Sequence, residues 1–285
     1  MKESIDTHFQ LDNVTPKEFL AVIKALRDDC FYSPDEIAVE LEKKYMFKMQ
    51  DDHTYTPRRL FDLDLVTREK NNNKISYRIN ERGVKIKKII DFKQNLIYDV
   101  LHYLHYTSYD KNNPISRKLL WSYYKGCYFI WSKKKKIEDK EMSSHIQSEI
   151  RLEFNQLEHT SRIGARFSSK ASSSIKCWIN VLDPCPFSPN KKDRSIYPRI
   201  VQNYELALLA LDDLYRRNEF SYGTPVLLNE DIVNQLAGVF FLDLTCFREL
   251  LRIASKVTTY IKLDDARAGG QKITLLRPYT IMDIR

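Results

Sequence analysis

Apolar residues near the N-terminus recur at helical spacing in three segments, each opened by residues that favour a helix start. The segments begin at Thr15-Pro16, at Ser33-Pro34 and at Thr56-Pro57. A hydroxyl side chain can cap the first turn, and proline is tolerated there because it needs no backbone hydrogen bond. The pattern therefore predicts three helices upstream of Leu65.

The spacing then changes from helical to alternating. Two short segments, Leu65–Glu69 and Ile75–Ile79, flank the polar stretch Asn71–Asn73, and Glu81-Arg82-Gly83 follows. Alternation around a polar turn is typical of a β-hairpin. We expect a two-stranded hairpin with its tip at Asn71–Asn73, followed by a strand-to-helix junction.

Residues 16–90 resemble the winged-helix superfamily. Its third helix ends in an apolar-x-x-Leu-x-Leu-Val-x-Arg run, matched here by Leu60–Arg68, and a Tyr-x-Ile-x-x-x-Gly junction follows, matched by Tyr77–Gly83. The family has Gly before Leu-Val, whereas this chain has Asp64, a residue type that tolerates left-handed backbone. The resemblance covers about a quarter of the chain.

The resemblance implies a DNA-binding function. The third helix would enter the major groove and the hairpin, or wing, would contact phosphate or the minor groove. The basic residues placed for such contacts are Arg58, Arg59, Lys70, Lys74 and Arg78. The alternative is that the wing lysines are merely solvated and that the fold serves as a protein-docking module.

The middle of the chain combines aromatic and basic residues. Trp121, Tyr124, Tyr128 and Trp131 follow helical spacing in a helix opened by Pro114. Aromatic and basic side chains together can form a platform for single-stranded nucleic acid, but the helical spacing favours a buried stripe. An apolar helix from Asp91 to Tyr106 precedes it, either as a linker or dimerisation helix or packed against the first domain.

Four consecutive lysines follow the aromatic helix. They could neutralise phosphates, or they could be a solvated helix end. These residues are Lys133, Lys134, Lys135 and Lys136.

A serine-rich segment then leads into another expected helix, which Pro184 ends. With the helix and turn before it, this segment predicts a second helix-turn-helix without a clear wing. The residues expected to face DNA are Ser168, Ser169, Lys170 and Ser173.

The C-terminal segment repeats the order of the first. Helices are expected over 201–214, from Leu227 through Val239, and from Leu244 through Ile253, followed by strands at 258–263 and 272–276. We therefore expect a mainly α protein with small β-hairpin wings and tandem winged-helix or helix-turn-helix domains. The expected domains are 1–90, 91–190 and 191–285.

Charge is unevenly divided along the chain. The net charge is +8, residues 93–199 carry +9, and residues 58–90 carry +6. The C-terminal segment from residue 200 carries −1, which suits phosphate less and favours an assembly role there. The basic regions coincide with the first helix-wing region and the middle segment, as expected for a nucleic-acid partner.

Several kinds of chemistry are not indicated. Only seven glycines argue against a phosphate loop or a Rossmann domain, and Cys177 and Cys185 lack zinc-site spacing. We expect no metal, no cofactor and no enzymatic activity. A nuclease using Glu42 in a Glu-x-Lys pair is a remote alternative. The five scattered cysteines are expected to be free thiols, and the sequence shows neither an apolar leader nor a membrane-spanning run. We therefore expect a cytoplasmic, nucleoid-associated protein.

The sequence thus predicts a protein that binds double-stranded DNA through several winged-helix modules. It would regulate transcription or provide DNA recognition to a prokaryotic assembly, as a homodimer or within a larger complex. The alternative is an assembly subunit of a defence, mobile-element or chromosome complex, in which winged helices bind protein.

Overall fold

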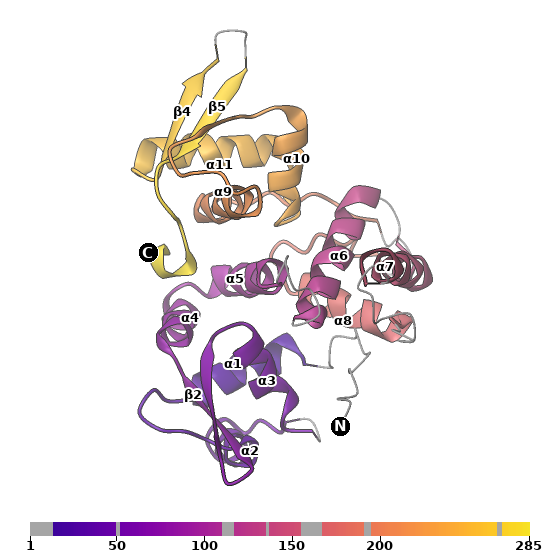
Figure 1. Cartoon of the computed structure of the whole chain (residues 1–285), viewed down its shortest axis with the longest axis vertical. Helices are drawn as coiled ribbons and strands as arrows, with labels where there is room; N and C mark the ends of the chain where they lie inside the picture. The colour runs from indigo at the N-terminus through magenta and orange to yellow at the C-terminus, as the bar shows by residue number, and fades with distance from the viewer. Residues whose placement is uncertain are drawn as a thin grey trace.

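The computed structural model describes residues 14–49, 52–109, 117–134, 137–154, 167–190, 195–266 and 270–285. Within these ranges the chain is mainly helical and carries two small antiparallel sheets, which confirms the predicted fold class at this level. Figure 1 shows three groups of elements around a central helix: α1–α4 with the first hairpin below, α6–α8 at one side, and the elements from α9 to the C-terminus above.

Local capping determines where the N-terminal helices begin. The Thr15 hydroxyl accepts a hydrogen bond from the Glu18 amide at 3.2 Å, and Ser33 forms a reciprocal capping box with Glu36. The third helix begins at Tyr55, slightly before the predicted start. The helices of this group are α1 (Pro16–Ala25), α2 (Pro34–Tyr45), α3 (Tyr55–Asp62) and α4 (Glu81–Phe92).

The predicted hairpin is confirmed. β1 (Val66–Asn71) pairs antiparallel with β2 (Lys74–Ile79), and the two turn residues, Asn72 and Asn73, both have positive φ, at 48° and 63°. Asparagine tolerates this conformation, which matches the twist of a tight hairpin. Asp64, just before β1, is also left-handed, with φ 57°.

The middle of the chain is organised around α5. The expected helix from Asp91 to Tyr106 is divided at Lys93, and α5 is buried along most of its length from Leu96 to Tyr106. This burial supports the packing alternative over a free linker. The helices here are α5 (Gln94–Thr107), α6 (Lys118–Lys133), α7 (Asp139–Phe154) and α8 (Ser169–Asn180).

The C-terminal group contains the three predicted helices and the predicted hairpin. It also contains a short strand that the sequence pattern did not predict, β3, which gives a sheet of order β3-β5-β4. The first helix begins at Glu205 rather than at 201. The elements are α9 (Glu205–Arg217), β3 (Pro225–Leu227), α10 (Glu230–Gly238), α11 (Leu244–Val257), β4 (Ile261–Asp265), β5 (Gln271–Leu275) and the 3₁₀ helix η1 (Ile281–Asp283).

Two buried histidines on α5 join neighbouring groups in their neutral form. His102 Nε2 donates to the Val239 carbonyl at 2.7 Å, and its Nδ1 accepts from the Tyr123 hydroxyl at 2.7 Å. His105 donates to the Leu101 carbonyl at 2.8 Å and packs on Trp178, with ring centroids 4.2 Å apart. Burial lowers the pKa of both imidazoles to about 3.

We predict that stability falls as the pH drops below neutrality. An unfolded histidine has a pKa of about 6.5, so between that pH and the folded pKa the unfolded chain binds more protons. Going from pH 7 to pH 5 should cost roughly 2 kcal/mol of unfolding free energy for each of His102 and His105. Urea unfolding at the two pH values measures this, and imidazole NMR that shows either ring titrating near pH 6.5 in the folded protein would contradict it.

Candidate nucleic-acid interface

The first helix-hairpin region brings some of the predicted basic residues together and separates others. Arg58 is exposed on α3, and Lys70 is exposed on β1. Burial raises the pKa of Tyr77, whereas the charges of Arg68 and Arg58 lower it. Arg58 precedes Phe61 by three residues, so the two lie on the same side of α3. Arg68 also stacks over Phe61 of α3, 4.5 Å from the ring centroid. Arg58, Arg68 and Lys70 therefore form one basic strip along α3 and β1, hereafter the α3 strip.

Lys74 and Arg78 lie on the other face of the hairpin. Antiparallel pairing sets Lys70 opposite Ile75 and Asn71 opposite Lys74, so Lys70 and Lys74 project to opposite sides. Arg78 is half-buried, with its guanidinium 4.8 Å from the centroid of the Phe31 ring. A single phosphate backbone could reach Lys70 and Lys74 together only by crossing the hairpin tip.

The prediction that Arg59 contacts DNA is wrong. Its side chain is among the largest fully buried ones, with 1% of the residue exposed. Thr56, Arg59, Leu60 and Leu63 share the helix face that packs inward, because they are spaced by three and four residues. That spacing is visible in the sequence and would have separated Arg59 from Arg58. Arg68 was missed, although it is two residues from Lys70 on one strand.

The described lysines of the basic run have partners within the chain. Lys133 forms an ion pair with Glu141 at 2.8 Å. Lys134 donates to the Asn234 side chain at 3.0 Å and lies 4.7 Å from the Trp131 ring centroid. Lys135 and Lys136 lie outside the described residues. Phosphate contact by this run stays a prediction, and for the described lysines it would compete with these contacts.

The serine-rich segment forms a helix as expected. Ser168 caps α8 by accepting from the Ala171 amide at 3.3 Å, so its side chain serves the helix. Ser169, Lys170 and Ser173 are exposed on α8. The turn expected before this helix, at 163–165, lies outside the described residues, and the second helix-turn-helix stays a prediction.

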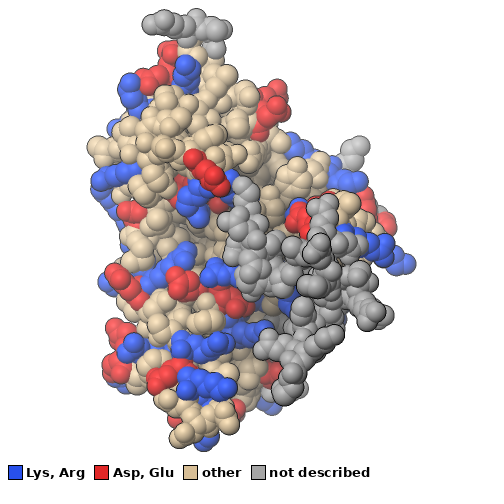
Figure 2. All heavy atoms as spheres, viewed as in Figure 1, with Lys and Arg blue, Asp and Glu red and all other residues tan. Residues whose placement is uncertain are grey.

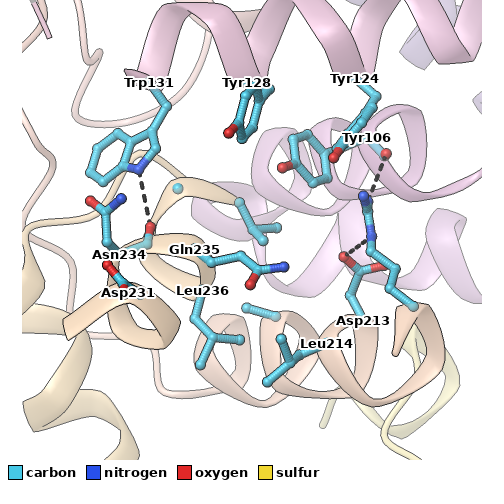
Figure 3. A pocket seen from close by; sticks show the side chains of 14 residues that line it. Tyr106, Tyr124, Tyr128, Trp131, Asp213, Leu214, Asp231, Asn234, Gln235 and Leu236 are labelled. Carbon is cyan, nitrogen blue, oxygen red and sulfur yellow. Dashed lines mark hydrogen bonds and ion pairs between the residues drawn. The ribbon is translucent and has the colours of Figure 1, made fainter. Parts of the chain in front are cut away.

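The aromatic stripe of α6 is only partly buried. Trp121 and Trp131 are buried, Tyr124 is half-buried, and Tyr128 is 54% exposed. Tyr128 lines a cavity of about 400 Å³ between α6 and the helices α9 and α10 (Figure 3). The predicted buried stripe is therefore correct for the two tryptophans and wrong for Tyr128.

The cation that lines this cavity already has partners. Arg217 lies 4.5 Å from the Tyr124 ring centroid and pairs with Asp213 at 2.6 Å. Nearby, Lys134 lies over the ring of Trp131. The Trp131 indole donates to the Asn234 carbonyl at 3.0 Å (Figure 3). These contacts join α6 to α9 and α10, and we assign the cavity walls a packing role.

The second hairpin and its preceding helix carry basic residues that are partly neutralised by neighbours. On α11, Arg248 is exposed and Arg252 pairs with Glu249 at 2.7 Å. On β4, Lys262 pairs with Asp264 at 2.9 Å. On the face drawn in Figure 2, basic and acidic side chains are interspersed without one continuous basic field.

Other kinds of site were sought in the same ranges. Among the described residues, no group of three His, Cys, Asp or Glu side chains could hold a metal ion. Glu42 is exposed on α2. No helix within the described ranges is long and apolar enough to cross a bilayer. Neither the protein-family models nor the curated proteins compared with this chain give a match.

We predict that Arg59→Ala destabilises the fold. Truncating a large buried side chain should lower the free energy of unfolding by about 2–4 kcal/mol. Arg58→Ala, the matched exposed neighbour, should change it by less than about 0.5 kcal/mol. Urea denaturation of the two variants provides the comparison, and equal, small effects would contradict the burial of Arg59.

We also predict that Gly238→Ala destabilises the joint between α6 and α10. A Cβ at this position would lie 2.7 Å from two atoms of the Trp131 ring, and the indole hydrogen bond restrains that ring. The clash should cost about 1–3 kcal/mol, more than the roughly 1 kcal/mol that alanine gains in a helix. Thermal unfolding monitored by tryptophan fluorescence measures it. A rise in melting temperature would mean that helix propensity outweighs the contact.

Proposed function

We propose that this protein is a DNA-binding protein containing two winged-helix modules, and that it acts without enzymatic chemistry as a transcription regulator or a DNA-recognition subunit. The supporting observation is a repeated order of elements. In the first region the order is α1, α2, α3, β1 and β2, with a bridge from Tyr32, between α1 and α2, to Tyr77 of β2. In the second the order is α9, β3, α10, α11, β4 and β5, with β3 pairing with β5.

The two regions therefore share a connection pattern as well as three helices followed by a two-stranded hairpin. In each, a short extended segment between the first two helices pairs with the last strand of the hairpin. This is the arrangement expected of winged helices, in which the third helix and the hairpin lie next to each other. The three-residue strand β3 strengthens the proposal because the sequence pattern had not suggested it.

The α3 strip is the surface best suited to DNA phosphates. Its three cations are exposed or partly exposed on adjoining elements, and they belong to a region of net charge +6. Cations that neutralise phosphates release counterions, which gives affinity that falls with salt.

The second region is better suited to a protein partner. Two of its surface cations are already paired with neighbouring carboxylates, and its segment of the chain carries −1. We therefore assign DNA contact to the first region and assembly to the second. The competing function is a role in protein assembly alone. The same paired charges favour it if the α3 strip does not bind DNA.

We predict that duplex DNA binds in a salt-sensitive manner and that the double variant Arg58→Ala/Lys70→Ala binds at least tenfold more weakly. Losing two phosphate contacts should also reduce the slope of log affinity against log salt by about 2. Fluorescence anisotropy with a random duplex at several salt concentrations measures both quantities.

Lys88→Ala is the matched control for this experiment, since Lys88 is exposed on α4, outside the α3 strip. It should bind as the parent does. Absence of duplex binding at low salt by the folded protein would refute DNA binding and favour the assembly function. Equal losses in the double variant and the control would refute the α3 strip as the contact surface.

A further inference from the structure

A second cavity lies where the three groups of elements meet. Its volume is about 570 Å³, within the size range of small-molecule sites. It opens between α4, the C-terminal end of α5, the start of α6, α9 and the C-terminal η1. The residues that line it are Arg82, Tyr103, Thr107, Ser108, Tyr109, Arg117, Asp212, Arg216, Thr280, Ile281 and Met282.

Three arginines reach this cavity from three different elements. Arg82 comes from the first turn of α4, Arg117 from the residue before α6, and Arg216 from the last turn of α9. One carboxylate, Asp212, lines the cavity with them. Among the described lining residues the formal charge is therefore positive by two, at a place where solvent is partly excluded.

The arginines keep donor capacity for a ligand. Arg82 lies 3.5 Å from Asp64, a long ion pair with a carboxylate whose side chain is 65% exposed. Arg117 uses Nη1 to donate to the Ser108 carbonyl at 2.9 Å. Each guanidinium has five N–H donors in a planar fork, so these contacts leave further N–H groups of Arg82 and Arg117 for other acceptors.

Arg82 and Arg216 both line this cavity. Burial lowers the pKa of Arg82; Asp64 raises it, and Arg216 lowers it further. Arg216 in turn is held by Asp212 at 2.8 Å, by Asp213 at 3.5 Å and by the Tyr103 hydroxyl at 3.0 Å. An anion in this cavity would offset the incomplete solvation of these guanidinium groups.

We propose that this cavity binds a small phosphate-bearing molecule, held by Arg82, Arg117 and Arg216. Phosphate oxygens accept paired hydrogen bonds from arginine forks. The recessed position among three groups of helices favours a small molecule over the backbone of a duplex. This inference does not depend on DNA binding by the α3 strip.

Bound ligand would tie the three parts of the protein together. Arg82 belongs to the N-terminal group, Arg117 to the middle group and Arg216 to the C-terminal group. Arg82 also reaches Asp64, the left-handed residue that precedes β1, and the Asn80 side chain donates to the Asp64 carbonyl at 3.1 Å. The site therefore adjoins the turn that sets the first hairpin on α3.

The test is isothermal titration calorimetry of the full chain with inorganic phosphate, pyrophosphate and ADP, with sodium chloride at matched ionic strength as the blank. We expect saturable binding of at least one phosphate probe, and a loss of affinity of tenfold or more in Arg82→Gln and in Arg117→Gln. Both substitutions are at residues with exposed surface, and thermal unfolding confirms that each variant folds. Arg27→Gln, at an exposed arginine paired with Asp29, should bind as the parent does.

Three outcomes would overturn the proposal. The first is no binding of any of the three probes, and the second is equal affinity in the two cavity variants and the Arg27 control. The third is that a short DNA duplex displaces the bound probe and that Arg117→Gln also binds DNA more weakly than the parent. That result would assign the cavity to the DNA backbone. Failure of DNA binding alone leaves the expected phosphate titration unchanged, so the two proposals fail separately.

Discussion

One buried ion pair joins the central helix α5 to the middle and C-terminal groups. Arg199 and Asp99 meet in two parallel hydrogen bonds, at 2.6 and 3.1 Å, with no exposed surface on the arginine side chain. The remaining guanidinium N–H groups donate to the carbonyls of Pro184, Asp183 and Phe240. A buried pair is tolerated only when its donors and acceptors are satisfied. Here that requirement brings α5, the segment after α8 and the α10–α11 turn to one point.

The two cavities follow from this joint. With α5 fixed between the middle and C-terminal groups, the C-terminal half of α5 faces both of them. Tyr106 borders the aromatic cavity, whereas Tyr103 and Thr107 border the arginine-lined one. The walls of the first are held by Arg217, which pairs with Asp213, and by the Trp131 indole, which donates to the Asn234 carbonyl. In the second, Arg82 has a long ion pair with Asp64 and Arg117 donates to a backbone carbonyl, so both guanidinium groups keep N–H donors that a ligand can use.

Local sequence signals predicted the helices and the hairpins. Features that depend on contacts between residues far apart in the sequence could not be predicted. Capping at Thr15 and Ser33 acts over a few residues and was correctly predicted. The polar turn was predicted at Asn71–Asn73, and the structure places it at Asn72 and Asn73, with Asn71 in β1. β3 has only three residues, and it is a strand because it pairs with β5. Three residues are too few for an alternating apolar and polar pattern, so the sequence could not predict this strand. Likewise nothing near Arg199 in the sequence indicates Asp99, a hundred residues away. The arginine-lined cavity is assembled in the same way, from residues that no single segment contains.

The candidate DNA surface shows the same division. The hairpin and α3 could be predicted from the sequence. The burial of Arg59 could also have been predicted, because its spacing places it on the inward face of α3 with Thr56 and Leu60. The separation of Lys70 from Lys74 required the strand register. Because adjacent strand positions point to opposite faces, a basic hairpin does not present one continuous basic surface. The useful charge is instead the strip in which a strand residue, Arg68, stacks against the helix that carries Arg58. That stacking makes the helix and the hairpin one surface, and it is the physical reason to assign DNA contact to the first region rather than to the wing lysines alone.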